Sequence, residues 1–580
     1  MSIIKTLAKQ IKEYKKDTIL SPVFVALETV MEVLIPFLMA YLIDDGINKN
    51  DMGAIYRIGG LLVVCAIASL VLGILSGKYS ARASAGFAKN LRKSMFYNVQ
   101  NFSFSNIDKF STASIITRHT TDITNVQMAF QMIIRVAFKM PLLLIFSLIM
   151  AFAVNVNLSL IFLVMVPFLA VGLYFIIKKA HPIFEYTFKV YDKLNEITQE
   201  NIKGIRVVKS YVTEDKEIDK FNNVSKEIYD SFSKAEKLVA LNNPLMQFSA
   251  DIVIILISLI GGVFIINTSL TTGELTSLIS YAMQILMSLM MISMIFVMIM
   301  ISRASAERIA EILNEESNLK NKENPVMQVK DGSISFENVS FSYTNDKNKE
   351  CLKEISVEIK SGETIGIIGG TGSSKTTFVQ LIPRLFDVTE GTVKVGGIDV
   401  RDYDIETLRN QVAMVLQKNV LFSGTIKDNM RWGDENATDE EIIKTCKQAQ
   451  ADEFIRSFPD GYDTYIEEGG ANVSGGQKQR LCIARALLKK PKILILDDST
   501  SAVDTKTDSL IRKAFKEELP DITKLIIAQR ISSVQDADKI IVLDNGRING
   551  IGTHDELLAN NEIYREVYTS QTKAGGEDEE

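Results

Sequence analysis

The chain has 580 residues, which is more than one compact domain usually contains. Hydrophobic residues make up 47% of it and the mean hydropathy is +0.13, which is high for a soluble protein. The net charge of -6 at pH 7 argues against nucleic acid as a partner, because phosphate binding requires a basic face. The four cysteines and three histidines are scattered, so we expect no metal site made from them and a reduced, cytoplasmic environment.

The first 17 residues predict an amphipathic helix rather than a cleavable signal. Five lysines alternate there with apolar residues at helical spacing, a pattern typical of a helix that lies on the inner surface of a membrane. The alternative is a frayed cytosolic start of the chain.

Six apolar stretches follow, each long enough to cross a membrane, which takes about 20 residues. Because backbone polar groups in lipid must be paired within their own segment, we expect these stretches to be helices. We assign residues 18–315 to this transmembrane domain. The six spans lie at roughly 19–42, 56–77, 136–155, 158–177, 246–266 and 277–300.

The segments that join the spans are uneven in length and charge. Spans 1 and 2, 3 and 4, and 5 and 6 are joined by short loops, whereas the segments after spans 2 and 4 are long, charged and helical in pattern. Lys78, Lys178, Lys179 and Arg303 border the long segments, so the positive-inside rule predicts that these segments and both termini are cytoplasmic. Arg135 and Lys139 are then expected near the inner interface, where their side chains snorkel.

Two features of the spans suggest a substrate cavity. Glu32 lies in the middle of the first span, where an ionisable residue faces either a cavity or a partner helix, and it is a candidate for selecting cationic compounds. Methionines recur in the last span, and their flexible side chains suit promiscuous apolar surfaces. Ordinary helix packing is the alternative for both features. The candidate methionines are Met287, Met291, Met294 and Met298.

The second half of the chain predicts an α/β domain. Residues 316–331 are polar and contain Pro325, which is typical of a linker. In residues 332–571, apolar runs at 363–369, 411–416, 492–497 and 524–529 alternate with helical patterns and predict buried parallel strands. We expect the acidic end, residues 572–580, to be a disordered tail.

A phosphate-binding loop follows the first of these strands and opens a helix. Backbone N–H groups of such a loop bind phosphate oxygens, Lys375 adds a positive charge for the β- and γ-phosphates, and the Thr376 hydroxyl can bind Mg²⁺. Asp497 ends another strand and is the second expected Mg²⁺ ligand. A glycine-containing helix start, suited to a γ-phosphate, precedes that strand. The loop comprises Gly369, Gly370, Thr371, Gly372, Ser373, Ser374, Lys375, Thr376 and Thr377, and the helix start comprises Ser474, Gly475, Gly476 and Gln477.

Together these motifs resemble the ATP-binding-cassette superfamily, and with six preceding spans the chain resembles an ABC exporter half-transporter of the type IV, multidrug type. The resemblance covers essentially the whole chain. It implies a six-span α-helical domain followed by an α/β cassette with a helical subdomain, with ATP and Mg²⁺ as cofactors. It also implies short docking helices near Phe102–Phe110 and Thr213–Phe221 that pass cassette motion to the membrane.

The resemblance assigns roles to further residues of the cassette. Tyr343 matches the aromatic residue that stacks on adenine. Gln417 matches the glutamine that senses Mg²⁺ and the membrane domain, so it is a candidate for both catalysis and metal binding. Glu468 and Gly470 resemble the exporter-specific loop before the signature, which is Ser474–Gln477. Ser501 and Asp504 match the D-loop.

Three positions depart from the family pattern. Asp498 stands where the family has the glutamate that polarises the attacking water, and a misplaced general base loses roughly 10²–10⁴ in rate. Gln529 replaces the histidine that contacts the γ-phosphate, and Ser374 replaces a glycine of the phosphate loop. In the family two cassettes pair head to tail, with each ATP between one phosphate loop and the other signature. These departures beside an intact signature predict a degenerate ATP site and a second, non-identical half-transporter as partner.

The expected function is therefore ATP-driven export of amphipathic or hydrophobic compounds by one half of a heterodimer, with hydrolysis mainly at the site that the partner completes. The alternatives are a homodimeric exporter of lipids or peptides and an ATP-gated channel or regulatory subunit. We expect a multi-pass protein in the cytoplasmic membrane of a bacterium, in contact with lipid and a small amphipathic substrate.

Overall fold

The computed structural model of the chain describes residues 3–344, 346–498 and 502–575. These residues form two compact units. One unit contains Met1–Gln100 and Ser111–Glu315, and the other contains Asn101–Phe110 and Glu316–Glu580. The short segment Asn101–Phe110 therefore belongs with the cassette, although the chain on both sides of it belongs to the membrane unit.

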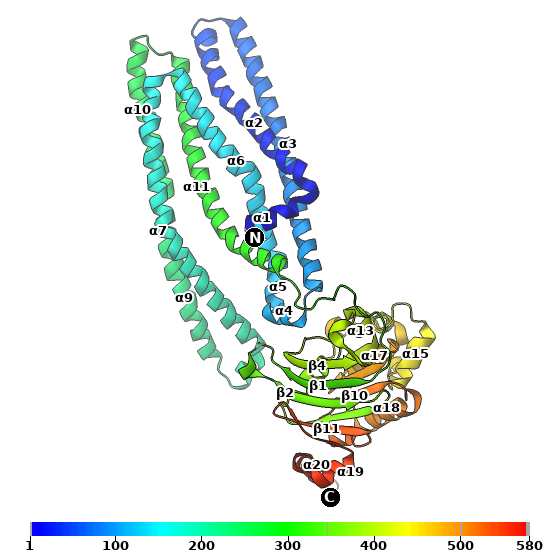
Figure 1. The fold of residues 1–580 in the computed structure, drawn as a ribbon. Coiled ribbons are helices and arrows are strands. Elements are labelled where there is room, and N and C mark those ends of the chain that lie inside the picture. The colour runs from blue at the N-terminus through cyan, green and yellow to red at the C-terminus, as the bar shows by residue number, and fades with distance from the viewer. Residues whose placement is uncertain (1–2, 345, 499–501, 576–580) are drawn as a thin grey trace. The chain divides into compact units, whose positions relative to one another are not determined.

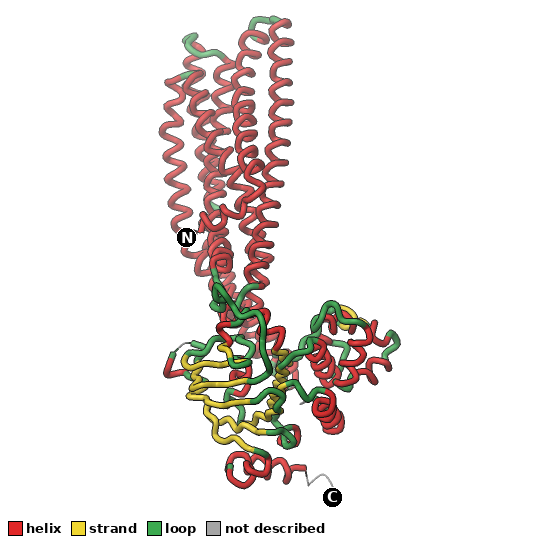
Figure 2. Tube along the Cα trace, turned by 45° about the vertical axis from the view of Figure 1, so that its right-hand side comes forward, coloured by secondary structure: helices red, strands yellow, loops and turns green. Residues whose placement is uncertain are grey.

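The membrane unit consists of long helices that lie side by side in both views (Figures 1 and 2). Six helical segments among the described residues are long and apolar enough to cross a membrane, and they overlap the six predicted spans, of which the third ends one residue early, at Val154. The helices are α1 (Ile3–Ala8), α2 (Lys15–Tyr41), α3 (Met52–Gln100), α5 (Thr112–Thr117), α6 (Ile123–Val154), α7 (Val156–Lys203), α8 (Ile205–Ser210), α9 (Glu214–Val239), α10 (Asn242–Ile266) and α11 (Thr272–Asn314). Short irregular helical turns, Lys9–Tyr14, Leu42–Ile47 and Arg118–Asp122, join α1 to α2, extend α2 and lead into α6.

The short loops between spans turn the chain with ordinary helix caps. The Asn155 side chain accepts a hydrogen bond from the Leu158 backbone at 3.1 Å and so begins α7 directly after α6. Thr271 and Glu274 form a capping box that begins α11. Beyond the predicted spans, α3, α7 and α11 continue for many residues, as the charged helical pattern of the long segments predicts.

The N-terminal segment is not the single helix expected over residues 1–17. The chain leaves helical geometry at Lys12, where φ is +42°, between α1 and α2. Contacts with α3 hold this bend. Asn90 donates to the Gln10 carbonyl at 3.0 Å, and the Tyr14 ring occupies the space that a Cβ at Gly86 would need, 2.3 Å away. Tertiary contacts with α3 therefore override the local helical pattern.

The docking helix expected at Thr213–Phe221 is also different. The short helix in this region is α8, which ends at Ser210, and residues 214–221 begin the long helix α9. Asp215 and the two glutamates around it lie in the first turn of α9. Their negative charges stabilise the helix there, because they interact with the positive end of its dipole. The helix expected near Phe102–Phe110 is present as α4, Phe104–Lys109.

The cassette contains two main sheets. The larger sheet has the order β12-β11-β3-β10-β9-β6, in which only β12 is antiparallel to its neighbour. A four-stranded antiparallel sheet has the order β2-β1-β4-β5. The strands are β1 (Ile334–Phe341), β2 (Leu352–Ile359), β3 (Thr364–Ile368), β4 (Glu390–Val395), β5 (Ile398–Asp399), β6 (Val412–Val415), β7 (Gly424–Thr425), β8 (Tyr465–Ile466), β9 (Ile493–Asp497), β10 (Thr523–Ile527), β11 (Lys539–Asp544) and β12 (Arg547–Gly552).

Helices pack around the sheets of the cassette. One part of the cassette consists mainly of helices and contains no strand of the two main sheets (Figure 2). A helical group between β6 and β9 packs its buried face into one continuous apolar core with the parallel strands. This group is the helical subdomain that the family resemblance implies. The cassette helices are α12 (Lys375–Gln380), α13 (Ile405–Gln411), α14 (Ile426–Arg431), α15 (Asp439–Gln448), α16 (Asp452–Ser457), α17 (Gly475–Leu488), α18 (Thr505–Glu518), α19 (His554–Asn560) and α20 (Glu562–Gly575). The helix α20 includes residues 572–575 of the expected acidic tail, and residues 576–580 lie outside the described residues.

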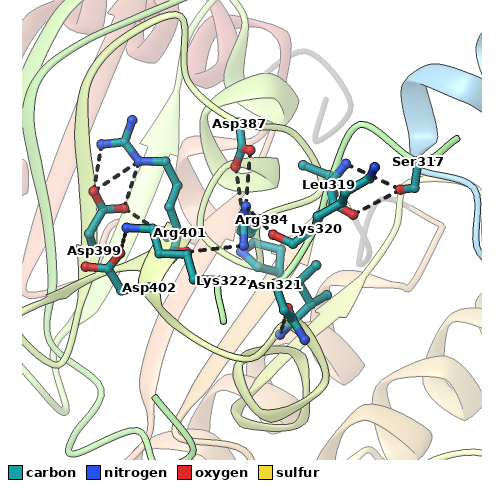
Figure 3. Close-up of polar contacts among 12 residues, drawn as sticks. Ser317, Leu319, Lys320, Asn321, Lys322, Arg384, Asp387, Asp399, Arg401 and Asp402 are labelled. Carbon is teal, nitrogen blue, oxygen red and sulfur yellow. Dashed lines mark hydrogen bonds and ion pairs between the residues drawn. The ribbon is translucent and has the colours of Figure 1, made fainter. Parts of the chain in front are cut away.

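The linker, residues 316–331, packs against the cassette. Val326 exchanges backbone hydrogen bonds with Asp402 and Asp404, at 2.8 and 3.1 Å, and the Val329 side chain is buried. Figure 3 shows its first half, where Arg384 donates to the Lys320 carbonyl at 3.3 Å. A segment held by its backbone in this way has little freedom to move independently of the cassette.

Candidate nucleotide site

The order of the parallel strands brings the predicted motifs to one edge of the sheet. Strands β3, β10, β9 and β6 are consecutive neighbours, and their carboxyl ends point the same way. The phosphate loop follows β3, Gln529 follows β10, Asp497 and Asp498 end β9, and Gln417 follows β6. Four segments that are far apart in the sequence therefore lie along one edge, as a ligand site of an open α/β sheet requires.

The phosphate loop is in direct contact with the Lys375 ammonium. The Lys375 ammonium donates to the carbonyls of Gly369 and Gly370, at 2.7 and 2.8 Å, and to the Ser373 hydroxyl at 3.3 Å. It therefore sits over the loop that is expected to hold phosphates. Partial burial lowers the pKa of Lys375, while the charges of Asp497 and Asp498 oppose this shift. Thr371, Gly372 and Thr377 complete the loop and the first turn of α12.

Ser374 occupies its position at a conformational cost. Its φ is +70°, in the left-handed region that favours glycine, and it directly precedes α12. Its side chain makes no capping hydrogen bond to the helix. The departure from glycine is therefore compatible with the fold of the loop but strains its backbone.

The residues predicted to bind Mg²⁺ fit a metal ion. The Thr376 hydroxyl donates to Asp497 Oδ1 at 3.0 Å, and Asp497 Oδ2 is buried without a hydrogen-bond partner. Burial raises the pKa of Asp497, and the nearby Asp498 charge adds to this. An unpaired buried carboxylate oxygen beside a hydroxyl is the donor set that a hard cation would satisfy.

Asp498 is held by glutamines rather than left free. The Gln529 amide donates to Asp498 Oδ2 at 2.6 Å, and Gln417 also hydrogen-bonds to this carboxylate. Burial raises the pKa of Asp498, although these hydrogen bonds favour its charged form. The two residues that depart most from the family pattern are therefore partners of each other, which only the strand order brings about.

A polar cavity of about 130 Å³ adjoins these two side chains. Asp498, Gln529, Arg530, Asp508 and Ser533 contribute to its lining. A polar space of this size admits several water molecules. The carboxylate of Asp498 is thus restrained but within reach of water.

Tyr343, the predicted adenine platform, lies beside the phosphate loop. Its side chain is 48% exposed, and its hydroxyl hydrogen-bonds with the Thr377 hydroxyl at 2.9 Å, directly beside the phosphate loop. The aromatic rings of Phe341 and Phe386 meet its ring edge to face, with centroids 4.8 and 5.2 Å away. The ring is therefore packed against two other aromatic rings and remains partly exposed. Sequence reasoning missed Phe386, for which the sequence holds no separate motif.

The signature forms a well-capped helix start. Ser474 Oγ accepts from the Gln477 backbone at 3.3 Å, and Gln477 Oε1 accepts from the Ser474 backbone at 2.9 Å. Gly476 lies against the D-loop, because a Cβ there would be 2.8 Å from the Ala502 carbonyl. Asp504 caps α18, and Ser501 of the predicted D-loop lies outside the described residues. Glu468 and Gly470 form a short turn before the signature, in which Lys478 donates to the Gly469 carbonyl.

Glu32 has a partner helix in the membrane unit. Lys139 of α6 donates to Glu32 at 2.7 Å and to Glu28 at 2.8 Å. Lys139 is thus an internal ion-pair partner rather than a snorkelling side chain, which corrects the expectation for it. Glu28 was missed by sequence reasoning, although it lies one turn from Glu32 on the same helix. The Glu28 carboxylate fits against α3 because Gly73 has no side chain there.

The candidate substrate methionines occupy one long helix. Met287 and Met294 of α11 are each 60% exposed, whereas Met291 and Met298 are half-buried. An exposed row of flexible apolar side chains is compatible with a lining for apolar compounds and with contact to lipid.

Comparison with known proteins matches both halves of the chain. Residues 18–290 match the family model of the ABC transporter transmembrane region, and residues 352–501 match that of the ABC transporter. YfiB of Bacillus subtilis, named an uncharacterized ABC transporter ATP-binding protein, is 36% identical over 94% of each chain. YgaD of the same organism and a protein of Staphylococcus aureus are 32% and 31% identical, over 98% of this chain and all of theirs. Both of these names propose a multidrug export ATP-binding/permease protein.

Proposed function

The chain belongs to the ABC transporter family, as a membrane region and an ATP-binding domain on one chain, and on that premise we propose that it is the degenerate-site half of a heterodimeric exporter. Members of this family couple ATP hydrolysis to transport. In the proposed assembly this chain's phosphate loop holds ATP that turns over slowly. Its signature completes a faster site on a partner chain that carries the usual glutamate and histidine.

The observation that carries this proposal is the hydrogen bond between Gln529 and Asp498. A general base must reach the proton that it removes, and the shorter aspartate side chain, tied back by an amide, is poorly placed to do so. Glutamine also lacks the charge and the proton relay of an imidazole. Both substitutions weaken the same step of hydrolysis while leaving Lys375, Thr376 and Asp497 to bind nucleotide and Mg²⁺.

Support for a partner comes from the signature. Its glycines open α17 with free backbone N–H groups, and the positive end of the helix dipole favours a γ-phosphate there. If this chain's own site lacks its catalytic groups, its intact signature is most useful when it completes the ATP site of a different chain. A homodimer would contain two identical, slow ATP sites and no fast one.

We further propose that the substrate is an amphipathic, drug-like compound and that the cassette is cytoplasmic. The names of YgaD and the Staphylococcus aureus relative propose multidrug export, and the exposed methionines of α11 suit varied apolar ligands. Lysines and an arginine border the long helical extensions, which favours the cytoplasmic side for them.

The first test is the steady-state Mg²⁺-ATPase rate of this chain purified alone, with Asp498→Asn as the matched control. A background rate that the control leaves unchanged supports the need for a partner. A robust rate that Asp498→Asn abolishes means that Asp498 is a working base, and the heterodimer proposal then fails in favour of a homodimer. Uphill movement of a fluorescent substrate into vesicles separates an exporter from an ATP-gated channel, which only dissipates a gradient.

A further inference from the structure

Three aromatic rings form a continuous line from α4 to the adenine platform. The Phe104 ring of α4 lies 6.1 Å from the Phe386 ring, measured between centroids, and Phe386 lies 5.2 Å from Tyr343 in an edge-to-face arrangement. All three residues belong to the cassette unit. Phe386 thus contacts both the Tyr343 ring and the short helix in the first long segment between the spans.

Phe386 is held in a rigid turn. Arg384 and Asp387, which flank it, form a bidentate ion pair with distances of 2.8 and 3.2 Å (Figure 3). Arg384 is 4% exposed and has a φ of +51°, and its carbonyl accepts a hydrogen bond from Arg409 at 2.8 Å. A buried arginine in this conformation persists only where its surroundings determine it. The turn therefore presents the Phe386 ring in one orientation.

The linker ties α4 to this same turn. Asn106 of α4 donates to the Glu316 carbonyl, and Asn318 of the linker donates to the Ser105 hydroxyl, both at 3.2 Å. Four residues later along the chain from Glu316, the Lys320 carbonyl accepts from Arg384. The helix α4 is thus connected to the turn that holds Phe386 in two ways, by the Phe104 ring and by the linker. Any displacement of α4 relative to the cassette acts on Phe386 through the ring and through Arg384.

Tyr343 in turn depends on its neighbours for its orientation. Phe341 is buried behind it, and Phe386 bounds its ring at a right angle, 89°. Burial raises the pKa of the Tyr343 hydroxyl, and the Asp108 carboxylate of α4 contributes to this, which also indicates that α4 lies nearby. Edge-to-face contacts of this kind favour one ring geometry over others.

We propose that Phe386 is a positioning residue for adenine, which links the docking of α4 to nucleotide affinity. The inference rests on the proposed ATP site. With α4 docked, Phe104 and Phe386 hold the Tyr343 ring ready to stack on the base. With α4 displaced, the ring loses this support and the base binds less tightly, whereas the phosphate loop is unaffected. By thermodynamic reciprocity, ATP binding then favours the docked position of α4.

The test compares a ligand that has a base with one that has none. ATP and inorganic tripolyphosphate are titrated calorimetrically against the full-length chain in lipid nanodiscs. For Phe386→Ala and Phe104→Ala we expect ATP affinity to fall about three- to tenfold, the range that a lost aromatic pair allows, and tripolyphosphate affinity to stay unchanged. Phe386→Tyr keeps the ring and should restore ATP affinity. Phe458→Ala is the matched control, since its ring pairs with Phe454 in the helical subdomain, away from Tyr343.

Three results would overturn the inference. Unchanged ATP affinity in both alanine variants means that Phe386 does not position the platform. Equal losses for ATP and tripolyphosphate in both Phe386→Ala and Phe104→Ala mean that these rings support the whole phosphate loop and do not act selectively on the base. Failure of the unmodified chain to bind ATP would overturn the proposed nucleotide site itself, and the inference with it.

Discussion

In the proposed assembly the cassette carries two surfaces for ATP, and they differ in how closely they follow the family pattern. The chain's own site has an aspartate at the base position, a glutamine at the switch position and a strained serine in the phosphate loop. The signature, which would serve the ATP of a partner, keeps every motif residue and a complete capping box. The departures are therefore confined to residues that act on this chain's own nucleotide.

This difference separates binding from hydrolysis. In the proposed site Lys375, Thr376 and Asp497 would bind phosphate and metal, and their contacts fit both roles. Asp498 stands at the position expected to polarise the attacking water and Gln529 at the position expected to contact the γ-phosphate, and the two side chains hydrogen-bond each other. In the proposed assembly this site would therefore hold ATP without turning it over quickly.

The largest expected effect comes from damaging the signature in the native complex isolated through a tag on this chain. Gly475→Asp places a negative charge at the helix start that faces the partner's γ-phosphate, and we expect ATPase activity to fall about 10²-fold or more. A Cβ at Gly475 would meet only the Ala502 Cβ, at 3.6 Å, so the fold should tolerate the change. Gly475→Ala is the matched control. Equal activity of Gly475→Asp and the unmodified complex would break the comparison.

The reverse change should repair the chain's own site. Asp498→Glu together with Gln529→His restores the family pattern and removes the hydrogen bond that holds Asp498 back. We expect the ATPase rate of the chain to rise about 10²-fold, because a correctly placed general base contributes roughly that much. The single variant Asp498→Glu shows how much of the gain needs the histidine. A double variant no faster than the unmodified chain would place the defect elsewhere.

A smaller effect is expected in the phosphate loop. Ser374→Gly relieves a left-handed backbone that costs about 1–2 kcal/mol in a residue with a Cβ. The midpoint of thermal unfolding of the cassette should therefore rise, whereas Ser374→Val should lower it. The single tryptophan, Trp432, lies in the cassette and reports its unfolding by fluorescence. A lower midpoint for Ser374→Gly would mean that the serine side chain stabilises the loop.

The smallest expected effect concerns pH. Burial raises the pKa of Asp497, so this carboxylate takes up a proton at a higher pH than an ordinary aspartate, and its protonated form binds Mg²⁺ poorly. On acidification from about pH 7.5 to pH 5, the Mg²⁺ dependence of ATP affinity should weaken earlier than an ordinary aspartate would allow. In Asp497→Asn the Mg²⁺ dependence should be weak throughout. A midpoint near the ordinary aspartate pKa would exclude Asp497 as the titrating group.

Local sequence determined the parts of the molecule that follow from length and pattern. Six apolar stretches of membrane length became six long helices, because lipid leaves the backbone no other way to pair its polar groups. The runs at 363–369, 411–416, 492–497 and 524–529 became β3, β6, β9 and β10, because continuous apolar runs between turn signals suit strands buried on both faces. The phosphate loop and the signature were recognisable for the same reason, since each is a contiguous motif.

Tertiary structure alone decided which of these parts meet. The order β3-β10-β9-β6 places Gln529 beside Asp498, and helix packing pairs Glu32 with Lys139, 107 residues away. It also bends the N-terminal segment at Lys12 and lays Phe386 between Phe104 and Tyr343. Such contacts depend on strand order and on close packing between distant segments. No local pattern encodes them, because each residue is ordinary in its own sequence context and acquires its role only from its neighbours in space.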